Sequence, residues 1–167
     1  APAQTPTQID TLSGVLLCGN GGSVTPTEIT LPFASADDLE RVEGMSIVAG
    51  ATQDLVISEF FNFDRFGEIV LTTDRAMQPT AVYAPGTPEA AALAEANQLA
   101  RITLDDNRTS QNPDPALHPN GQPFTLDNLF RGGDTVENVT GVINYSFGLY
   151  RIQPTRGADY TAVNPRP

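Results

Sequence analysis

The chain has 167 residues, which is enough for one domain with its own hydrophobic core. It carries 20 acidic and 9 basic residues, all nine of them arginine, for a formal net charge of −11. This charge repels phosphate at long range and excludes a generally basic nucleic-acid binder, and no apolar run approaches the ~20 residues of a membrane span.

The first half of the chain reads mainly as short strands. Residues 11–18 and 24–31 are rich in Thr, Val, Ile and Leu and are separated by a glycine-rich turn, which predicts strand, loop, strand. Ser35 is positioned to cap a short helix over 35–43, which Gly44 ends. Further strands are expected over 45–49, 55–61 and 68–72. A turn over 62–67 is expected to join the last two.

The second half begins with the clearest helix. Thr87 is the expected N-cap and Pro88 the first helical residue of a helix that runs to about Ala100. Its alanine-rich face predicts a helix that lies close to a sheet or plugs the end of a barrel. A strand at 102–104, a long polar loop over 105–123 and β structure at 134–145 and 148–153 follow. We therefore expect a mainly β fold, an OB-like β-barrel or distorted sandwich with one or two short helices.

The single cysteine and the single histidine do not indicate catalysis. Cys18 lies among apolar residues and is expected to be a buried thiol or to have its partner elsewhere in a longer chain. His118 lies in a turn-like sequence and is expected to be exposed. No catalytic constellation is visible, so this segment is expected not to be an enzyme by itself.

The polar loop carries a candidate metal site. Its carboxylate and amide oxygens are the ligands that Ca²⁺ prefers, and nearby prolines restrict the backbone that carries them. The alternative is that these side chains accept hydrogen bonds from nearby backbone amides in Asx turns. The candidate ligands are Asp105, Asp106, Asn112 and Asp114.

A second candidate site combines aromatic and arginine side chains on two expected hairpins. Exposed aromatics beside arginines stack bases and hold phosphates on small β-barrels that bind single strands. The alternative is that the aromatics pack in the core and the arginines pair with carboxylates. The candidate residues are Phe63, Arg65, Phe66, Tyr145, Phe147, Tyr150 and Arg151.

Several stretches, in this order, resemble the middle region of secreted bacterial endonucleases of the ExeM/NucH type. They are Leu39 to Met45, Phe61 to Glu68, Gln78 to Thr80, Leu104 to Asp106, Gln111 to Pro115, Gly133 to Val136, Thr140 to Val142 and Tyr145 to Pro154. The resemblance implies a secreted parent protein. In it, a β-barrel region precedes a catalytic domain of the endonuclease/exonuclease/phosphatase class, which hydrolyses phosphodiesters with Mg²⁺, Mn²⁺ or Ca²⁺. The hallmark residues of that catalytic domain are absent here.

On this resemblance, residues 1–23 are a linker or the last strand of a preceding barrel. Residues 24–160 are a β-rich non-catalytic domain, and 161–167 lead to a catalytic domain that would be a partner in the same polypeptide. The expected function is to position nucleic acid, with DNA as the candidate partner, for that catalytic domain. The alternative is a structural spacer that docks on the catalytic domain without binding substrate. Arginines gathered beside exposed aromatics would favour the first, and arginines paired to carboxylates the second.

Overall fold

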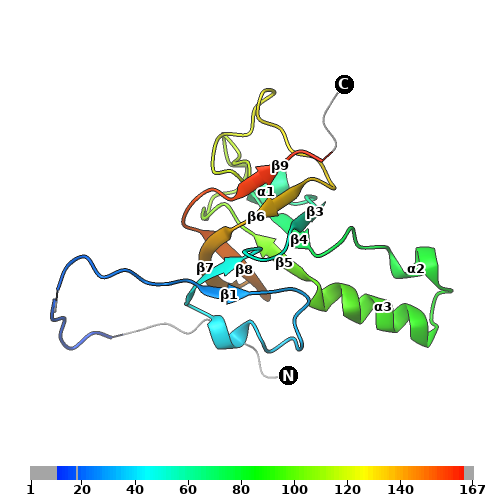
Figure 1. Ribbon diagram of the computed structural model, residues 1–167, viewed down its shortest axis with the longest axis horizontal. Helices are drawn as coiled ribbons and strands as arrows, with labels where there is room; N and C mark the ends of the chain where they lie inside the picture. The colour runs from blue at the N-terminus through cyan, green and yellow to red at the C-terminus, as the bar shows by residue number, and fades with distance from the viewer. Residues whose placement is uncertain (1–10, 18, 164–167) are drawn as a thin grey trace.

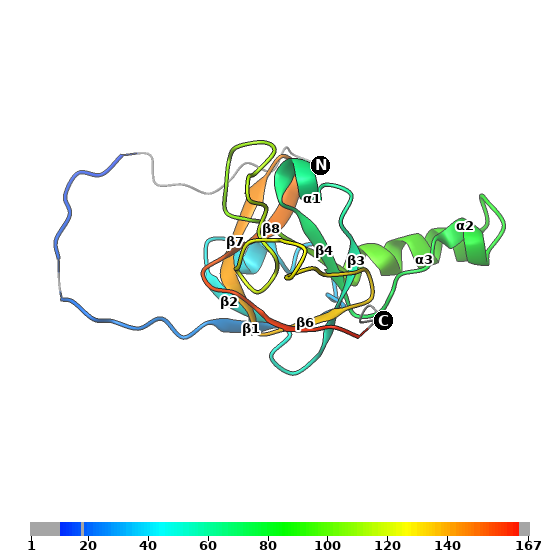
Figure 2. The same ribbon diagram turned by 90° about the horizontal axis from the view of Figure 1, so that it is seen from above.

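A computed structural model describes residues 11–17 and 19–163 (Figure 1). The described residues form one nine-stranded sheet in the order β1-β2-β7-β8-β5-β4-β3-β6-β9, which curls around the core (Figure 2). The mainly β, barrel-like prediction is confirmed, with one curled sheet in place of the two sheets of a sandwich. The strands are β1 Thr27–Ile29, β2 Ser46–Ala49, β3 Leu55–Glu59, β4 Ile69–Thr72, β5 Arg101–Leu104, β6 Thr135–Glu137, β7 Val139–Ser146, β8 Leu149–Pro154 and β9 Asp159–Thr161.

The core lies on the inner face of the curled sheet. Alternate residues of β2 and β3 are fully buried, as the period of two along a strand requires. All four residues of β4 are buried, which fits its central place between β3 and β5. The largest fully buried apolar side chains are Ile47, Leu55, Ile57, Ile69, Leu71, Ile102, Ile143 and Ile152.

Four short helical segments interrupt the strands: η1 Glu40–Val42, α1 Phe63–Phe66, α2 Pro79–Val82 and α3 Pro88–Leu99. The predicted helix at 88–100 is confirmed as α3, and the Thr87 side chain accepts a hydrogen bond from the Ala90 amide. Its predicted packing is wrong, because α2 and α3 extend away from the sheet as an arm (Figure 1). Only Ala90 of α3 is buried, since alanines spread around the helix provide too little apolar area to hold it against the sheet.

The N-terminal strand prediction is wrong for residues 11–17, which form no strand. Val15 and Leu16 are exposed, and the segment loops away from the sheet in both views (Figures 1 and 2). Pairing begins only at β1, and the expectation for Cys18 concerns a residue outside the described ones. No helix in the described part of the chain has the length and apolar content to cross a membrane.

Four adjacent strands hold the region of interest. In the order β7-β8-β5-β4, β7 and β8 form an antiparallel hairpin and β8 pairs with β5 in parallel. The Asp105 amide donates to the Ile152 carbonyl at 3.0 Å, so Asp105 stays in line with β8 just past the end of β5. Glu68 directly precedes β4. Residues far apart in the sequence therefore meet where β4 begins and β5 ends.

A close approach of β7 and β8 in this region supplies a stability prediction. A Cβ at Gly141 on β7 would lie 2.4 Å from the Gln153 carbonyl oxygen and 2.6 Å from Ile152 Cγ2. Gly141→Ala must push β7 from β8 and is expected to lower the free energy of unfolding by about 1–3 kcal/mol. Gly14→Ala is the matched control, because nothing lies within 4 Å of its Cβ position. Urea denaturation measures both; equal stabilities would contradict the close approach of the strands.

Candidate functional site: a hairpin braced by a buried arginine

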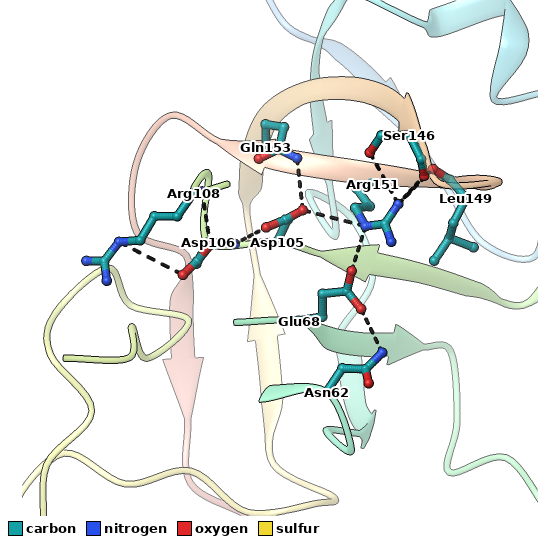
Figure 3. Close-up of polar contacts among 9 residues, drawn as sticks. All are labelled: Asn62, Glu68, Asp105, Asp106, Arg108, Ser146, Leu149, Arg151 and Gln153. Atoms are coloured by element: carbon teal, nitrogen blue, oxygen red, sulfur yellow. Dashed lines mark hydrogen bonds and ion pairs between the residues drawn. The ribbon is translucent and has the colours of Figure 1, made fainter. Parts of the chain in front are cut away.

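A buried arginine on β8 joins three separate parts of the sheet. Arg151 is 8% exposed, and its Nε lies 2.7 Å from Glu68 Oε1 and 3.6 Å from Asp105 Oδ2 (Figure 3). Glu68 directly precedes β4 and Asp105 directly follows β5. One guanidinium thus links β4, β5 and β8 inside the protein.

Further donors stabilise the two carboxylates around it. Glu68 Oε2 accepts from Asn62 Nδ2 at 2.9 Å, and Asp105 Oδ2 accepts from Gln153 Nε2 at 3.0 Å. Asp105 Oδ1 accepts from the Asp106 amide at 2.7 Å. Every carboxylate oxygen of this pair therefore has a donor. A buried ion pair needs these additional hydrogen bonds to offset the free-energy cost of removing its charges from water.

The same arginine also closes the β7–β8 hairpin. Its Nη1 donates to the carbonyls of Ser146 and Leu149, the two residues that flank the turn (Figure 3). The turn residues between them have positive φ, 51° at Phe147 and 78° at Gly148, the pattern of a two-residue type I′ hairpin. Arg151 therefore fixes the geometry of the hairpin tip from below.

The hairpin tip presents an aromatic side chain in an unusual conformation. Phe147 is 98% exposed, and a left-handed backbone is unfavourable for a bulky residue. Behind the tip, the rings of Tyr145 and Tyr150 lie 4.7 Å apart, and the Tyr150 hydroxyl donates to Glu40. Burial and this carboxylate raise the pKa of Tyr150. The hairpin thus carries an exposed phenylalanine, with Glu40 of η1 beside the tyrosine pair next to the turn.

The structure separates the predicted aromatic–arginine residues into two groups. Phe63 is buried, with its ring 4.9 Å from that of Phe130, and Arg151 is committed to Glu68 and Asp105. These two residues follow the alternative given in the sequence analysis, in which the aromatics pack in the core and the arginines pair with carboxylates. Arg65 is exposed on α1, with its guanidinium 5.0 Å from the centre of the Phe66 ring. Arg65 and Phe147 are the members that face solvent most openly.

The predicted metal ligands are not brought together. No cluster of three or more His, Cys, Asp or Glu side chains suited to a metal ion occurs among the described residues. Asn112 and Asp114 are exposed, whereas Asp105 faces Arg151. Asp105 and Asp106 instead accept backbone hydrogen bonds, Asp106 from the Arg108 amide at 3.0 Å, as the Asx-turn alternative describes. The calcium site stays a prediction.

Asp106 is the most constrained carboxylate of the loop. It is 6% exposed, and its Oδ2 has no hydrogen bond and lies 3.9 Å from Arg108 Nε. Its Cγ would lie 2.4 Å from a Cβ at Gly67, so only glycine at position 67 leaves room for it. Burial raises the pKa of Asp106, and the negative charge of Asp105 adds to this effect.

The prediction that His118 is exposed is wrong. The side chain is 1% exposed, its ring lies 4.4 Å from that of Tyr160, and Nδ1 accepts from the Asn120 amide at 3.0 Å. Burial lowers the pKa of His118 because the charged imidazolium is poorly solvated there. The rings of Phe130 and Tyr160 that cover it come from distant parts of the sequence, so its turn-like neighbours gave no signal of burial.

The ion-pair network supplies a stability prediction. Arg151→Met leaves Glu68 and Asp105 without their cation and is expected to lower the free energy of unfolding by about 3–5 kcal/mol. Arg101→Met is the matched control. It removes a pair with Glu59 whose side chain is half exposed, and should cost no more than about 1 kcal/mol. Chemical denaturation compares them, and similar losses would contradict the distinction between buried and exposed pairs.

His118 supplies a pH prediction. A folded-state pKa below 6.5 means that the folded protein binds fewer protons than the unfolded chain. The stabilisation is therefore fully present above pH 6.5 and is lost as the pH falls through the folded-state pKa. Because the chain has one histidine, NMR titration of its imidazole measures this pKa directly. A value at or above 6.5 would contradict the buried neutral ring.

Comparison with known proteins places the chain in a family. The family model described as "Domain of unknown function (DUF8508)" matches residues 3–165. No curated protein and no solved structure matches the chain. Because the match covers nearly all of the 167 residues, the chain belongs to the DUF8508 family.

Proposed function

We propose that this chain is a non-catalytic docking module that binds a neighbouring protein domain through the tip of the β7–β8 hairpin. The observation that carries the proposal is Phe147, a fully exposed aromatic residue held at φ 51° on a braced turn. Strained, exposed apolar residues are costly in a free domain and occur where a partner covers them.

The chemistry of the turn sharpens this argument. A type I′ turn forms best with Asn-Gly or Gly-Gly, because those residues adopt positive φ readily. Phe-Gly makes the same turn at a cost in strain and in exposed apolar area. Aromatic side chains that fill a pocket on a partner supply much of the energy of protein interfaces. The Arg151 bonds to Ser146 and Leu149 keep such a side chain in position before binding.

The distribution of charge favours a protein partner over nucleic acid. Among the described residues, Arg41, Arg101, Arg108 and Arg151 lie within ion-pair distance of carboxylates. Glu40 contacts Tyr150, one residue pair from the turn, and the chain as a whole has a net charge of −11. Phosphates approaching this hairpin would meet negative charge, whereas a partner surface with basic residues would be attracted.

The motif resemblance supports one identity for the partner. In secreted endonucleases of the ExeM/NucH type, the similar region precedes a catalytic domain of the endonuclease/exonuclease/phosphatase class. We therefore propose that the hairpin docks on such a catalytic domain within one secreted polypeptide. The module then sets the placement of the catalytic domain, and the divalent metal belongs to that domain.

One observation supports a second function, the positioning of DNA. Arg65 is exposed and stacks on Phe66 on the short helix α1, an arrangement able to hold a phosphate beside a base. If this function is correct, Arg65→Ala should weaken single-stranded DNA binding. It should also reduce the slope of log K against log salt by about 0.7. Arg75→Ala, also exposed, is the control; an unchanged affinity and slope for Arg65→Ala would refute this second function.

The docking proposal predicts opposite effects on stability and binding. Phe147→Asn replaces the strained residue by one that favours the turn and should raise the free energy of unfolding by about 1 kcal/mol. The same change should weaken binding to a purified catalytic domain of the ExeM/NucH type by at least about thirtyfold, the loss of a hot-spot residue. Thermal denaturation and titration calorimetry measure the two effects.

Phe61→Asn is the matched control, because Phe61 is 86% exposed on the β3–α1 connection, outside the hairpin. It should leave the affinity unchanged. Equal affinities for wild type and Phe147→Asn would refute docking through the hairpin. Absence of any binding by wild type would refute the proposed partner.

A further inference from the structure

A cleft of about 260 Å³ opens beside the buried ion-pair network. Its apolar lining includes Leu117 and Pro154, which are partly exposed, and the buried core residue Ile69 of β4. Asp105, Asp106 and Arg156 are the charged residues that line it. Small-molecule sites combine apolar lining with a few placed polar groups in this way.

The two carboxylates of this lining are not available to a ligand. Both oxygens of Asp105 already accept hydrogen bonds, from Gln153 and from the Asp106 amide. Asp106 Oδ1 accepts from the Arg108 amide, and its Oδ2 is sealed from solvent. Both carboxylates of the cleft wall therefore interact with the protein's own donors and not with the cleft.

Arg156 is different, because it is an exposed residue and has no carboxylate partner among the described residues. Its Nε donates to Thr140 Oγ1 at 3.1 Å, which orients the planar group beside the cleft, and its Nη groups have no hydrogen bond to the part of the chain that the structure describes. Thr140 is itself buried and donates to the Asn138 carbonyl, so the anchor is fixed. The charge that this cleft offers to a ligand is therefore positive, in a chain whose net charge is −11.

We propose that the cleft binds a small organic carboxylate, with the carboxylate on Arg156 and an apolar body against Leu117 and Pro154. The guanidinium fork matches a carboxylate in geometry and charge, and the apolar part of the lining favours a hydrocarbon chain over a hydrated inorganic anion. The volume suits a ligand smaller than a drug molecule. This site is independent of the hairpin and of the docking function.

The test uses acetate, butanoate, hexanoate and the neutral analogue hexanamide as probes, titrated into the isotopically labelled full chain in a buffer free of other organic anions. Affinity should rise by up to about fourfold for each added methylene that the cleft covers. Hexanamide should bind at least about tenfold more weakly than hexanoate. The methyl signals of Leu117 and Thr155, which line the cleft, should shift on binding.

Arg156→Gln should remove the preference for hexanoate over hexanamide, and Arg75→Gln, which makes the same charge change at another exposed arginine, should keep it. Inorganic phosphate tests charge alone and should bind no better than acetate. The proposal is overturned if the wild-type protein binds hexanamide and hexanoate equally, if affinity is independent of chain length, or if the shifts fall outside the cleft. Because these three results need only the wild-type protein, they decide the matter even if Arg156→Gln does not fold.

Discussion

The contact between Arg151 and the carboxylates of Glu68 and Asp105 joins parts of the structure that the backbone alone leaves separate. The guanidinium holds the start of β4, the end of β5 and the turn of the β7–β8 hairpin to one centre (Figure 3). A buried charge that loses its partner is strongly destabilising, so these elements keep a common geometry as long as the protein is folded.

This centre separates two surfaces with different properties. On one, the hairpin carries the exposed ring of Phe147 with Glu40 close to the turn, which suits a protein partner better than nucleic acid. On the other, the backbone beyond Asp105 turns the acidic side chains inward and leaves Arg156 as the accessible charge of the cleft. The strong negative charge of the chain is therefore a poor guide to either surface, because recognition depends on which charges are already paired.

The sequence predicted those features that depend on local patterns. The N-cap of α3 and the strands β2, β3 and β4 are all readable from neighbouring residues. The predictions that were wrong concern features that depend on contacts between residues far apart in the sequence. His118 is buried by rings from other segments, and residues 11–17 find no strand to pair with despite their β-like composition. The roles of Glu68, Asn62 and Gln153 were missed for the same reason, since nothing in their local sequence indicates a buried arginine across the sheet.

The central claim is that Arg151 holds Phe147 in its binding position. A double-mutant cycle tests it most directly, with the affinity for the catalytic-domain partner measured for wild type, Arg151→Met, Phe147→Ala and the double variant under conditions where all are folded. We expect coupling of more than about 1 kcal/mol, because a loosened hairpin gains little from its phenylalanine. Additive effects, equal within about 0.5 kcal/mol, would contradict it and would make the hairpin independent of the buried arginine.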